Sequence, residues 1–238
     1  TTSTLFPVGT PTTTAARTVE AVKTYGAGDS AVQALDGVTV ALPKGRFTAV
    51  MGPSGSGKST LMHCLAGLDT VTSGEVWIGE TALGSLSDKQ LTLLRRERLG
   101  FVFQSFNLVP TLTAYENITL PLDLAGTQPD HEWLDTVVAA VGLESRLAHR
   151  PSELSGGQQQ RVAIARALAT RPEVVFADEP TGNLDSKSGA QLLTFLRTAV
   201  DEFGQSVVMV THDPHASARA KRTVYLNKGQ LFAERPED

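Results

Sequence analysis

The segment Gly52-Pro-Ser-Gly-Ser-Gly-Lys-Ser59 constrains this chain more than any other stretch of its sequence. An apolar run at 46–51 precedes it and reads as a short buried strand, and a helix is predicted at 60–68. Glycines let backbone N–H groups converge on phosphate oxygens, and a helix N-terminus adds a favourable dipole. The pattern G-x-x-x-x-G-K-[ST] in this strand–loop–helix context therefore predicts a phosphate-binding loop rather than a flexible turn.

Each part of this phosphate loop has an expected role toward a nucleotide. Lys58 supplies a compact cation for the β- and γ-phosphates, and the Ser59 hydroxyl should ligate Mg²⁺. The expected cofactors are therefore ATP and Mg²⁺. The residues expected to contact the nucleotide here are Gly52, Pro53, Ser54, Gly55, Ser56, Gly57, Lys58, Ser59 and Thr60.

A second acidic element follows later in the chain. The apolar run that starts at Val174 ends in Asp178 and Glu179 and is broken at once by Pro180. A buried strand of a parallel sheet delivers its last residues to the carboxyl edge, where ligands bind. We expect Asp178 to hold Mg²⁺, through water, and Glu179 to accept a proton from the attacking water. A simple capping pair at a strand end is less favoured beside a phosphate loop.

Strand-like and helix-like segments alternate along the chain. This alternation predicts an α/β fold with a largely parallel sheet that is covered on both faces. The proline-punctuated, helical stretch at about 105–157 is predicted to be an inserted helical subdomain. Two short apolar runs, 224–226 and 230–233, are expected to form a terminal hairpin around Lys228-Gly229. We expect a flexible tail at 1–17 and a single domain at 18–238.

Composition and charge exclude several classes of function. The formal net charge is −4, so a basic protein that coats nucleic acid is not expected. Cys64 is the only cysteine, so an internal disulfide is impossible. No run approaches the length of a transmembrane helix, and the threonine-rich start does not read as a secretory signal. If the protein works at a membrane, we expect it to dock there through a partner.

A third motif, Leu154-Ser-Gly-Gly-Gln158, directly opens a predicted helix about 20 residues before Asp178. With it the chain resembles the ATP-binding cassette (ABC) ATPase family, whose signature is Leu-Ser-Gly-Gly-Gln. The resemblance implies a P-loop NTPase (RecA-like) core with an antiparallel β subdomain and an inserted helical subdomain. It also implies a head-to-tail dimer in which the signature of one copy closes over the ATP of the other. Its contacts would come from Ser155, Gly156, Gly157 and Gln158, although a plain N-cap by Ser155 would also explain the serine.

Four further positions match the family one by one. Tyr25 corresponds to the aromatic residue that stacks on adenine, and Gln104 to the glutamine that contacts Mg²⁺ and the attacking water. Asp185, in Asn183-Leu184-Asp185, corresponds to the loop that crosses the dimer, though it could equally be a helix N-cap. His212 corresponds to the switch histidine near the γ-phosphate. The resemblance thus implies Glu179, His212, Gln104 and Lys58 as catalytic residues, and Ser59, Gln104 and Asp178 as metal ligands.

The chain also resembles one subgroup, the lipoprotein-release (LolD-like) and macrolide-export (MacB-like) ATPases. The segments that carry this likeness include 25–29, 67–69, 94–96 and 100–108. It implies a separate permease of the FtsX/MacB type, with few transmembrane helices and a large extracytoplasmic domain, and a peripheral location on the cytoplasmic face of the membrane. The permease's coupling helix would lie near 106–115. The residues 77–80 and Glu153 depart from the subgroup pattern.

Other functions share some of these motifs. A DNA-repair cassette needs a long coiled-coil insertion, but only about 50 residues separate Gln104 from the signature. A translation-associated protein would carry two cassettes, and a small-molecule kinase would leave the signature without a role. A regulator that signals through a membrane partner to cell-wall enzymes remains the alternative to a transporter.

Overall fold

The computed structural model describes residues 14–232, and the rest of the predicted tail (1–13) and residues 233–238 lie outside the described part. A six-stranded sheet has the strand order β10-β9-β3-β8-β7-β6. Its neighbours pair in parallel except β10, which pairs antiparallel with β9, so the predicted parallel α/β sheet is confirmed. The strands are β3 (Phe47–Met51), β6 (Leu99–Phe103), β7 (Val174–Asp178), β8 (Ser206–Val210), β9 (Arg222–Asn227) and β10 (Gln230–Phe232).

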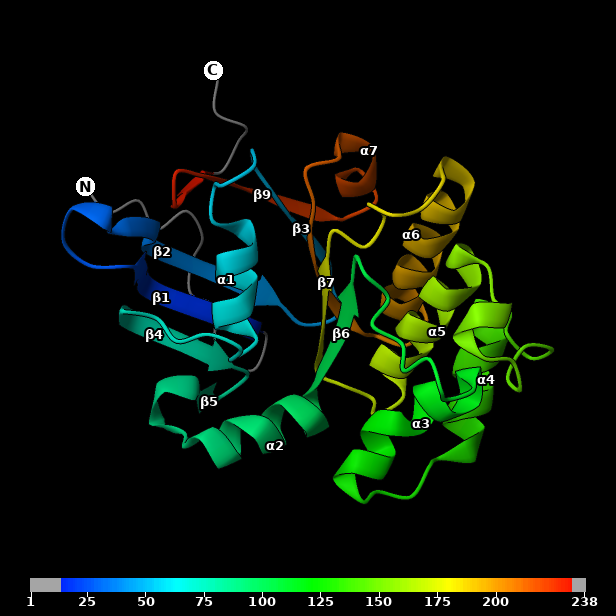
Figure 1. The fold of residues 1–238 in the computed structure, drawn as a ribbon. Coiled ribbons are helices and arrows are strands. Elements are labelled where there is room, and N and C mark those ends of the chain that lie inside the picture. Colours follow the sequence, from blue (N-terminus) through cyan, green and yellow to red (C-terminus); the bar gives the residue numbers. More distant parts are fainter. Residues whose placement is uncertain (1–13, 233–238) are drawn as a thin grey trace.

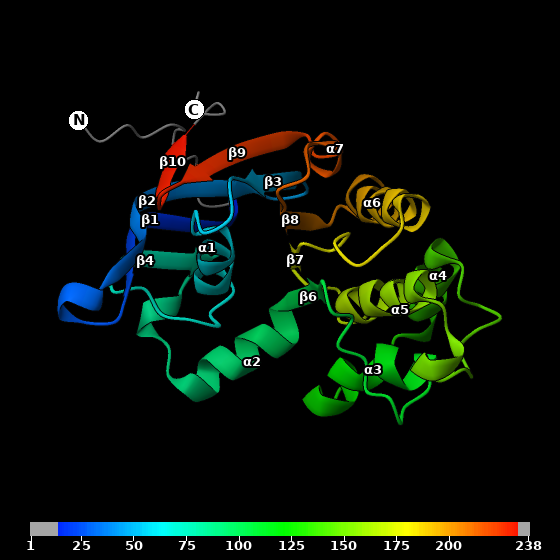
Figure 2. The ribbon, with the colours of Figure 1, turned by 45° about the horizontal axis from the view of Figure 1, so that its top comes forward.

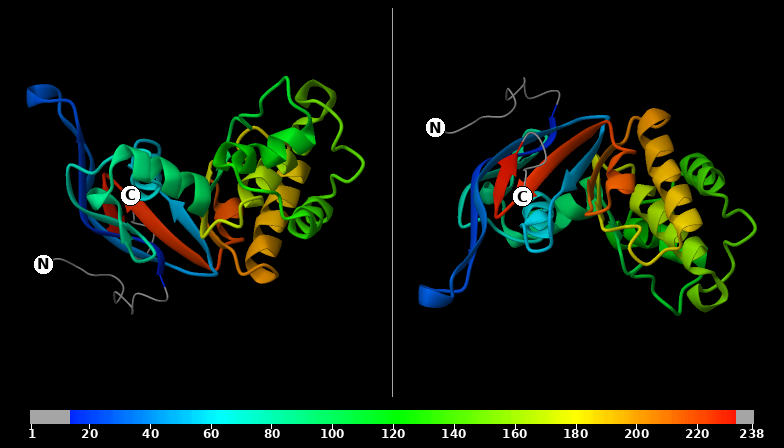
Figure 3. Two further views of the ribbon diagram at one scale, coloured as in Figure 1. Left: turned by 90° about the horizontal axis from the view of Figure 1, so that it is seen from below. Right: turned by 90° about the horizontal axis from the view of Figure 1, so that it is seen from above.

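A smaller antiparallel sheet forms the predicted β subdomain, with the order β2-β1-β4-β5. Its strands are β1 (Thr14–Tyr25), β2 (Val32–Pro43), β4 (Ser73–Ile78) and β5 (Thr81–Ala82). The long β1 and β2 project from the body of the molecule at the turn that joins them (Figure 3). The boundary predicted for the tail was wrong, because β1 already begins at Thr14, which pairs with Pro43 while Ala16 pairs with Leu42. Ala15 and Ala16 are buried there, and this burial fixes the strand.

Helices cover both faces of the parallel sheet (Figures 1 and 2). The helix α1 lies between this sheet and the antiparallel one, whereas α5 and α6 pack on the opposite face. The helices are α1 (Lys58–Leu65), α2 (Asp88–Arg98), α3 (Ala114–Ala125), α4 (His131–Val141), α5 (Gly156–Leu168), α6 (Ser186–Asp201) and α7 (Pro214–Ser217), with single 3-10 turns at Gly28–Ser30, Leu83–Ser85 and Pro151–Glu153.

The strand β7 shows how the sequence builds two hydrophobic cores. Alternate residues of a strand point to opposite faces of its sheet. Val174 and Phe176 enter the core on the α1 side, while Val175 and Ala177 enter the core on the α5 side. All four are at most 1% exposed. A continuous apolar run is what a strand covered on both faces requires.

The inserted segment is helical, as predicted. The helices α3 and α4 pack against α5, and their buried leucine, isoleucine and valine side chains extend the core on that face. Thr113 and Asp130 cap the two helices at their N-termini, and Gly126 and Gly142 end them in the left-handed conformation. Within residues 14–232, no helix is long and apolar enough to span a bilayer.

Local turn chemistry explains where three elements start or reverse. Gly57 adopts a left-handed conformation and accepts the first helical bond, so α1 begins at Lys58 rather than at the predicted residue 60. Asp185 caps α6 with its side chain, so this helix begins at Ser186. Lys228 and Gly229 both have positive φ, as a tight hairpin turn requires, and the predicted terminal hairpin is confirmed.

Candidate functional site

The loop 52–57 connects the end of β3 to the start of α1, as the sequence predicted. Two of its glycines are required by their surroundings. A Cβ at Gly52 would lie 1.9 Å from the Leu226 carbonyl oxygen, and one at Gly57 would lie 2.2 Å from the Ala34 carbonyl oxygen. Both residues also have positive φ, which side chains disfavour. The loop can therefore keep this shape only with glycine at these two positions.

Lys58 is buried inside the loop that precedes it. Its Nζ donates to the carbonyl oxygens of Gly52 at 2.9 Å and Pro53 at 2.8 Å. Burial lowers the pKa of Lys58, and the nearby carboxylates of Glu179 and Asp178 counteract this effect. A compact cation thus lies at the centre of the loop, opposite two carboxylates.

Oxygen atoms from three elements meet at the carboxyl edge of the sheet. The Ser59 hydroxyl donates to Asp178 Oδ1 at 3.3 Å. Both residues line a hollow of about 380 Å³, together with Phe103, Gln104, Ser105, Asn107 and Glu179. Burial raises the pKa of Asp178, while His63 and the Ser59 hydroxyl lower it. A hydroxyl, a carboxylate and an amide side chain are the oxygen donors that Mg²⁺ accepts beside phosphate oxygens.

Glu179 directly follows β7 and contacts the end of the neighbouring strand. Its Oε1 lies 2.9 Å from Nδ1 of His212, two residues beyond β8. The backbone N–H of Glu179 donates to the Val210 carbonyl at 3.0 Å, although its φ of 43° lies in the left-handed region. The sheet therefore fixes the position of this carboxylate and pairs it with the histidine named from the sequence.

Gln104 is held by the loop that follows Glu179. Its Nε2 lies 3.3 Å from Asn183 Oδ1, and Asn183 Nδ2 donates to the Gln104 carbonyl at 3.1 Å. A Cβ at Gly182 would come within 2.6 Å of Gln104 Nε2, so glycine lets the two segments approach. Gln104 thus lines the hollow with its amide nitrogen bonded to Asn183.

Tyr25 belongs to a network that sequence reasoning missed. Its hydroxyl donates to Asp69 Oδ2 at 2.6 Å, and Lys23 Nζ donates to Asp69 Oδ1 at 2.6 Å. Lys23 Nζ also lies 4.8 Å from the centroid of the Tyr25 ring. The bond to Asp69 raises the pKa of Tyr25, and the Thr60 hydroxyl lowers it. Tyr25 is thus fixed beside the start of α1, with 42% of the residue exposed.

The signature residues lie elsewhere in the molecule. They open α5, which packs on the face of the sheet opposite α1, and no hydrogen bond between described residues joins 155–158 to 52–59. Ser155 and Gln158 cap α5 reciprocally, through Gln158 N to Ser155 Oγ and Ser155 N to Gln158 Oε1. Asp185 caps α6 by accepting from Lys187 and Ser188. Within one chain, helix capping therefore explains the positions of the Ser155, Gln158 and Asp185 side chains. None of the three bonds to the phosphate loop in these caps.

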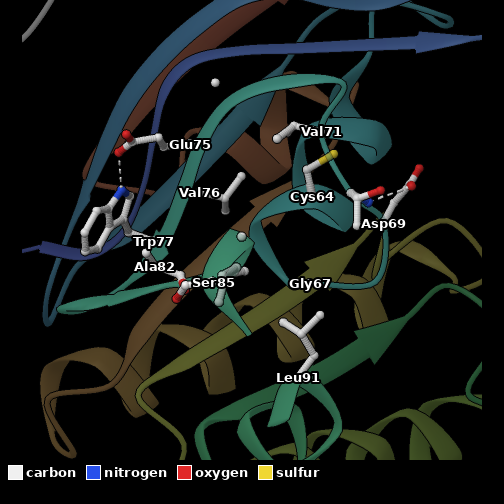
Figure 4. Close-up of a pocket in the computed structure, with 14 residues that line it drawn as sticks. Cys64, Gly67, Asp69, Val71, Glu75, Val76, Trp77, Ala82, Ser85 and Leu91 are labelled. Carbon is white, nitrogen blue, oxygen red and sulfur yellow. Dashed lines mark hydrogen bonds between the residues drawn. The ribbon is translucent and has the colours of Figure 1, made fainter. Parts of the chain in front are cut away.

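A second cavity of about 530 Å³ lies between the end of α1 and the antiparallel sheet (Figure 4). Its wall is mostly apolar, with Val71, Val76, Trp77 and Leu83. Trp77 Nε1 donates to Glu75 at its edge, as Figure 4 shows. Burial raises the pKa of Cys64, which also lines the cavity, to about 11, so this thiol stays protonated at neutral pH. Asp69 lines the cavity and also accepts the hydrogen bonds of Lys23 and Tyr25.

Comparison with known proteins points to one family. A family model described as "ABC transporter" matches residues 35–182. An uncharacterized ABC transporter ATP-binding protein of Methanocaldococcus jannaschii is 46% identical over 219 residues, which cover 89% of this chain and 93% of that protein. The lipoprotein-releasing system ATP-binding protein LolD of Legionella pneumophila is 45% identical over 213 residues, 89% of this chain and 94% of LolD.

One relative is much longer than this chain. The macrolide export ATP-binding/permease protein MacB of Bdellovibrio bacteriovorus is 44% identical over 212 residues, but the match spans 32% of MacB. Among solved structures, the Methanocaldococcus jannaschii cassette dimer in a post-hydrolysis state, bound to ADP and Pi, superimposes with a TM-score of 0.81 at 41% identity. The match covers 93% of this chain and 100% of that one.

Proposed function

Because this chain belongs to the ABC transporter family, in the subgroup of the MacB and LolD ATPases, we propose that it drives a separate membrane permease by hydrolysing MgATP as a head-to-tail dimer. One observation carries the proposal. The phosphate loop, Asp178 and the Glu179–His212 pair meet at one edge of the sheet, whereas the signature opens a helix on the other face. The site is therefore half of a composite one.

The nucleotide would lie along the loop 52–60, with adenine on Tyr25. Lys23 occupies one face of the Tyr25 ring, so adenine would stack on the other. Lys58 and the loop N–H groups would bind the β- and γ-phosphates. Ser59, Asp178 and Gln104 would hold Mg²⁺, which when bound neutralises charge on the phosphate oxygens.

Hydrolysis follows from the position of Glu179. Its carboxylate accepts a proton from water as the water oxygen attacks the γ-phosphorus and the bond to the β-phosphate oxygen breaks, releasing ADP and phosphate. His212 holds the carboxylate and donates to the transferring phosphoryl group. The Ser155 hydroxyl and the α5 N-terminus of a second copy stabilise the same charge from the opposite side.

A basic, partly apolar groove offers a place for the permease. It lies where α2 and α3 meet the end of β6, and its lining includes the exposed Leu68 and Leu124. Arg95, Arg96 and Arg166 also line it, and none of its lining residues is acidic. The groove includes Asn107, from the segment predicted to receive the coupling helix. An FtsX/MacB-like permease would insert an apolar segment with acidic flanks here, and the ATPase would stay peripheral on the cytoplasmic face.

The substitution Glu179→Gln tests the proposed function. It keeps the size of the side chain and removes the proton acceptor, so MgATP should still bind and trap a closed dimer while turnover stops. ATP hydrolysis and light scattering with and without MgATP measure both effects. A Glu179→Gln protein that hydrolyses ATP at the wild-type rate contradicts the proposal. The alternative, a regulator of cell-wall enzymes through a membrane partner, would use the same ATPase cycle and differ only in the partner's output.

A further inference from the structure

A side chain from helix α5 holds the backbone that follows Glu179. Gln160, on α5, is 1% exposed and donates from Nε2 to the Pro180 carbonyl oxygen at 3.0 Å. We propose that Gln160 is a positioning residue for Glu179, setting the direction of the carboxylate through this one bond. The inference rests on the proposed role of Glu179 as proton acceptor.

The turn at Glu179 needs such support. Its φ of 43° lies in the left-handed region, which a glutamate side chain disfavours. Pro180 has no N–H with which to anchor itself. Gly182 N donates to the Glu179 carbonyl at 3.0 Å, which closes the turn on one side only. The bond from Gln160 fixes the peptide between Pro180 and Thr181, one residue after Glu179.

The chemistry of Gln160 argues against a role in stability alone. No described residue donates to its Oε1, although that atom is buried. A buried acceptor without a partner is destabilising, and an apolar side chain of the same shape would avoid that cost. The hydrogen bond from the amide nitrogen to the Pro180 carbonyl thus explains why an amide side chain stands at this position.

A second buried glutamine provides a matched comparison. Gln205 is 7% exposed and donates from Nε2 to the Pro172 carbonyl at 2.7 Å. Pro172 precedes β7, and Pro180 follows it, so the two glutamines donate hydrogen bonds to proline carbonyls at opposite ends of the same strand. Only the Gln160 bond lies next to Glu179.

Gln160 also joins two functional elements of one chain. It lies two residues beyond the signature, and a Cβ at Gly157, within the signature, would come 2.9 Å from Ser188 Oγ. Ser188 in turn donates to Asp185. The start of α5 therefore contacts the segment 180–188 at two points. A shift of the signature when it engages the ATP of a second copy would reach the chain's own Glu179 through Gln160.

The test compares Gln160→Met with Gln205→Met, which each remove one amide-to-proline bond. Gln160→Met should lower kcat about tenfold or more while KM for ATP stays within about twofold. Gln205→Met should lower Tm and leave kcat per folded molecule unchanged. A Gln160→Met kcat within twofold of wild type, or an equal loss in both variants, overturns the proposal.

The variant Gln160→Glu adds a readout that a structural role would not move. Its ionised carboxylate cannot donate to the Pro180 carbonyl, whereas its protonated form can. Its kcat relative to wild type should therefore rise as the pH falls, and a ratio that does not change with pH contradicts the proposal. Failure here is distinguishable from failure of the proposed function, because an inactive Glu179→Gln beside fully active Gln160 variants would reject this inference alone.

Discussion

His212 Nδ1 lies 2.9 Å from Glu179 Oε1, although the two residues are 33 positions apart in the chain. The distance follows from the sheet, because β7 and β8 are parallel neighbours in which Asp178 pairs with Val210. Each side chain leaves the sheet just past this pair, at the same carboxyl edge. The sheet therefore brings the proposed proton acceptor, Glu179, into contact with His212.

His212→Ala removes one side of this pair. Glu179 should still accept a proton, but its carboxylate would lose its orientation and the phosphoryl group would lose a donor. We expect kcat to fall about 100-fold, the size typical of one lost donor to a transition state, with little change in ATP affinity. Steady-state hydrolysis and equilibrium binding of MgATP measure the two quantities. A loss confined to ATP affinity would place His212 in ground-state binding instead.

Asp178→Asn should separate activity from stability. Burial raises the folded-state pKa of Asp178, so the ionised group is less stable in the fold than in the unfolded chain at neutral pH. Asparagine keeps an oxygen for the Ser59 hydroxyl without the charge. We expect hydrolysis to be lost and Tm at pH 7 to rise, measured by calorimetry without nucleotide.

The raised pKa of Asp178 also predicts how the Tm difference between Asp178→Asn and the wild type changes with pH. A raised pKa contributes stability that is present at low pH and is lost as the pH rises through the folded-state value. The Tm advantage of Asp178→Asn should therefore shrink as the pH falls toward the aspartate range. If the Tm advantage of Asp178→Asn over the wild type grows as the pH falls, the pKa of Asp178 is not raised in the folded protein.

Asp69→Asn tests the network around Tyr25. The substitution removes the negative charge that holds Lys23 and the Tyr25 hydroxyl, so the ring should lose its fixed orientation. We expect ATP and ADP to bind several-fold more weakly, with kcat at saturating ATP nearly unchanged, because the adenine contact is remote from the γ-phosphate. Tyr25→Phe is the matched variant that removes only the hydroxyl bond. Equal affinity in all three proteins would show that the network does not orient the ring.

The groove beside α2 and α3 makes a prediction about the permease. Arg96→Glu places a carboxylate in a groove lined by arginines and apolar side chains. It should weaken binding of a permease with acidic flanks while leaving ATP hydrolysis by the isolated chain unchanged. Co-purification with the membrane protein, beside a Lys89→Glu control on the exposed face of α2, measures the effect. Normal complex formation by Arg96→Glu would show that the permease does not dock in this groove.

The parts of the site that could be predicted from the sequence are each marked by a local sequence pattern. The loop 52–59 and the acidic end of β7 each combine a motif with an apolar strand, and the structure places both at the same edge. The start of α2 also carries a local pattern, because Ser87 and Gln90 form a capping box there.

The parts that sequence reasoning missed depend on long-range contacts. Lys23 and Asp69 meet across 46 positions, and no periodic pattern links them. Gln160 carries no local signal in the sequence, because its hydrogen-bond partner Pro180 lies 20 positions away. The start of β1 was missed because Ala15 and Ala16 give a weak strand signal, and pairing with β2 decides the outcome.

The composite site can be tested by mixing two inactive proteins. Lys58→Ala removes the phosphate-binding cation, and Ser155→Arg blocks the signature. In a mixed dimer, the intact loop of one copy faces the intact signature of the other, so one complete site returns. Ser87→Arg, which removes the same kind of cap from α2, controls for lost helix capping and should leave hydrolysis intact.

The account predicts that each variant alone hydrolyses no ATP and that an equimolar mixture recovers about a quarter of the wild-type rate, as random pairing of symmetric dimers requires. A mixture as inactive as its parents, or a Ser155→Arg protein with the wild-type rate, would contradict the shared site.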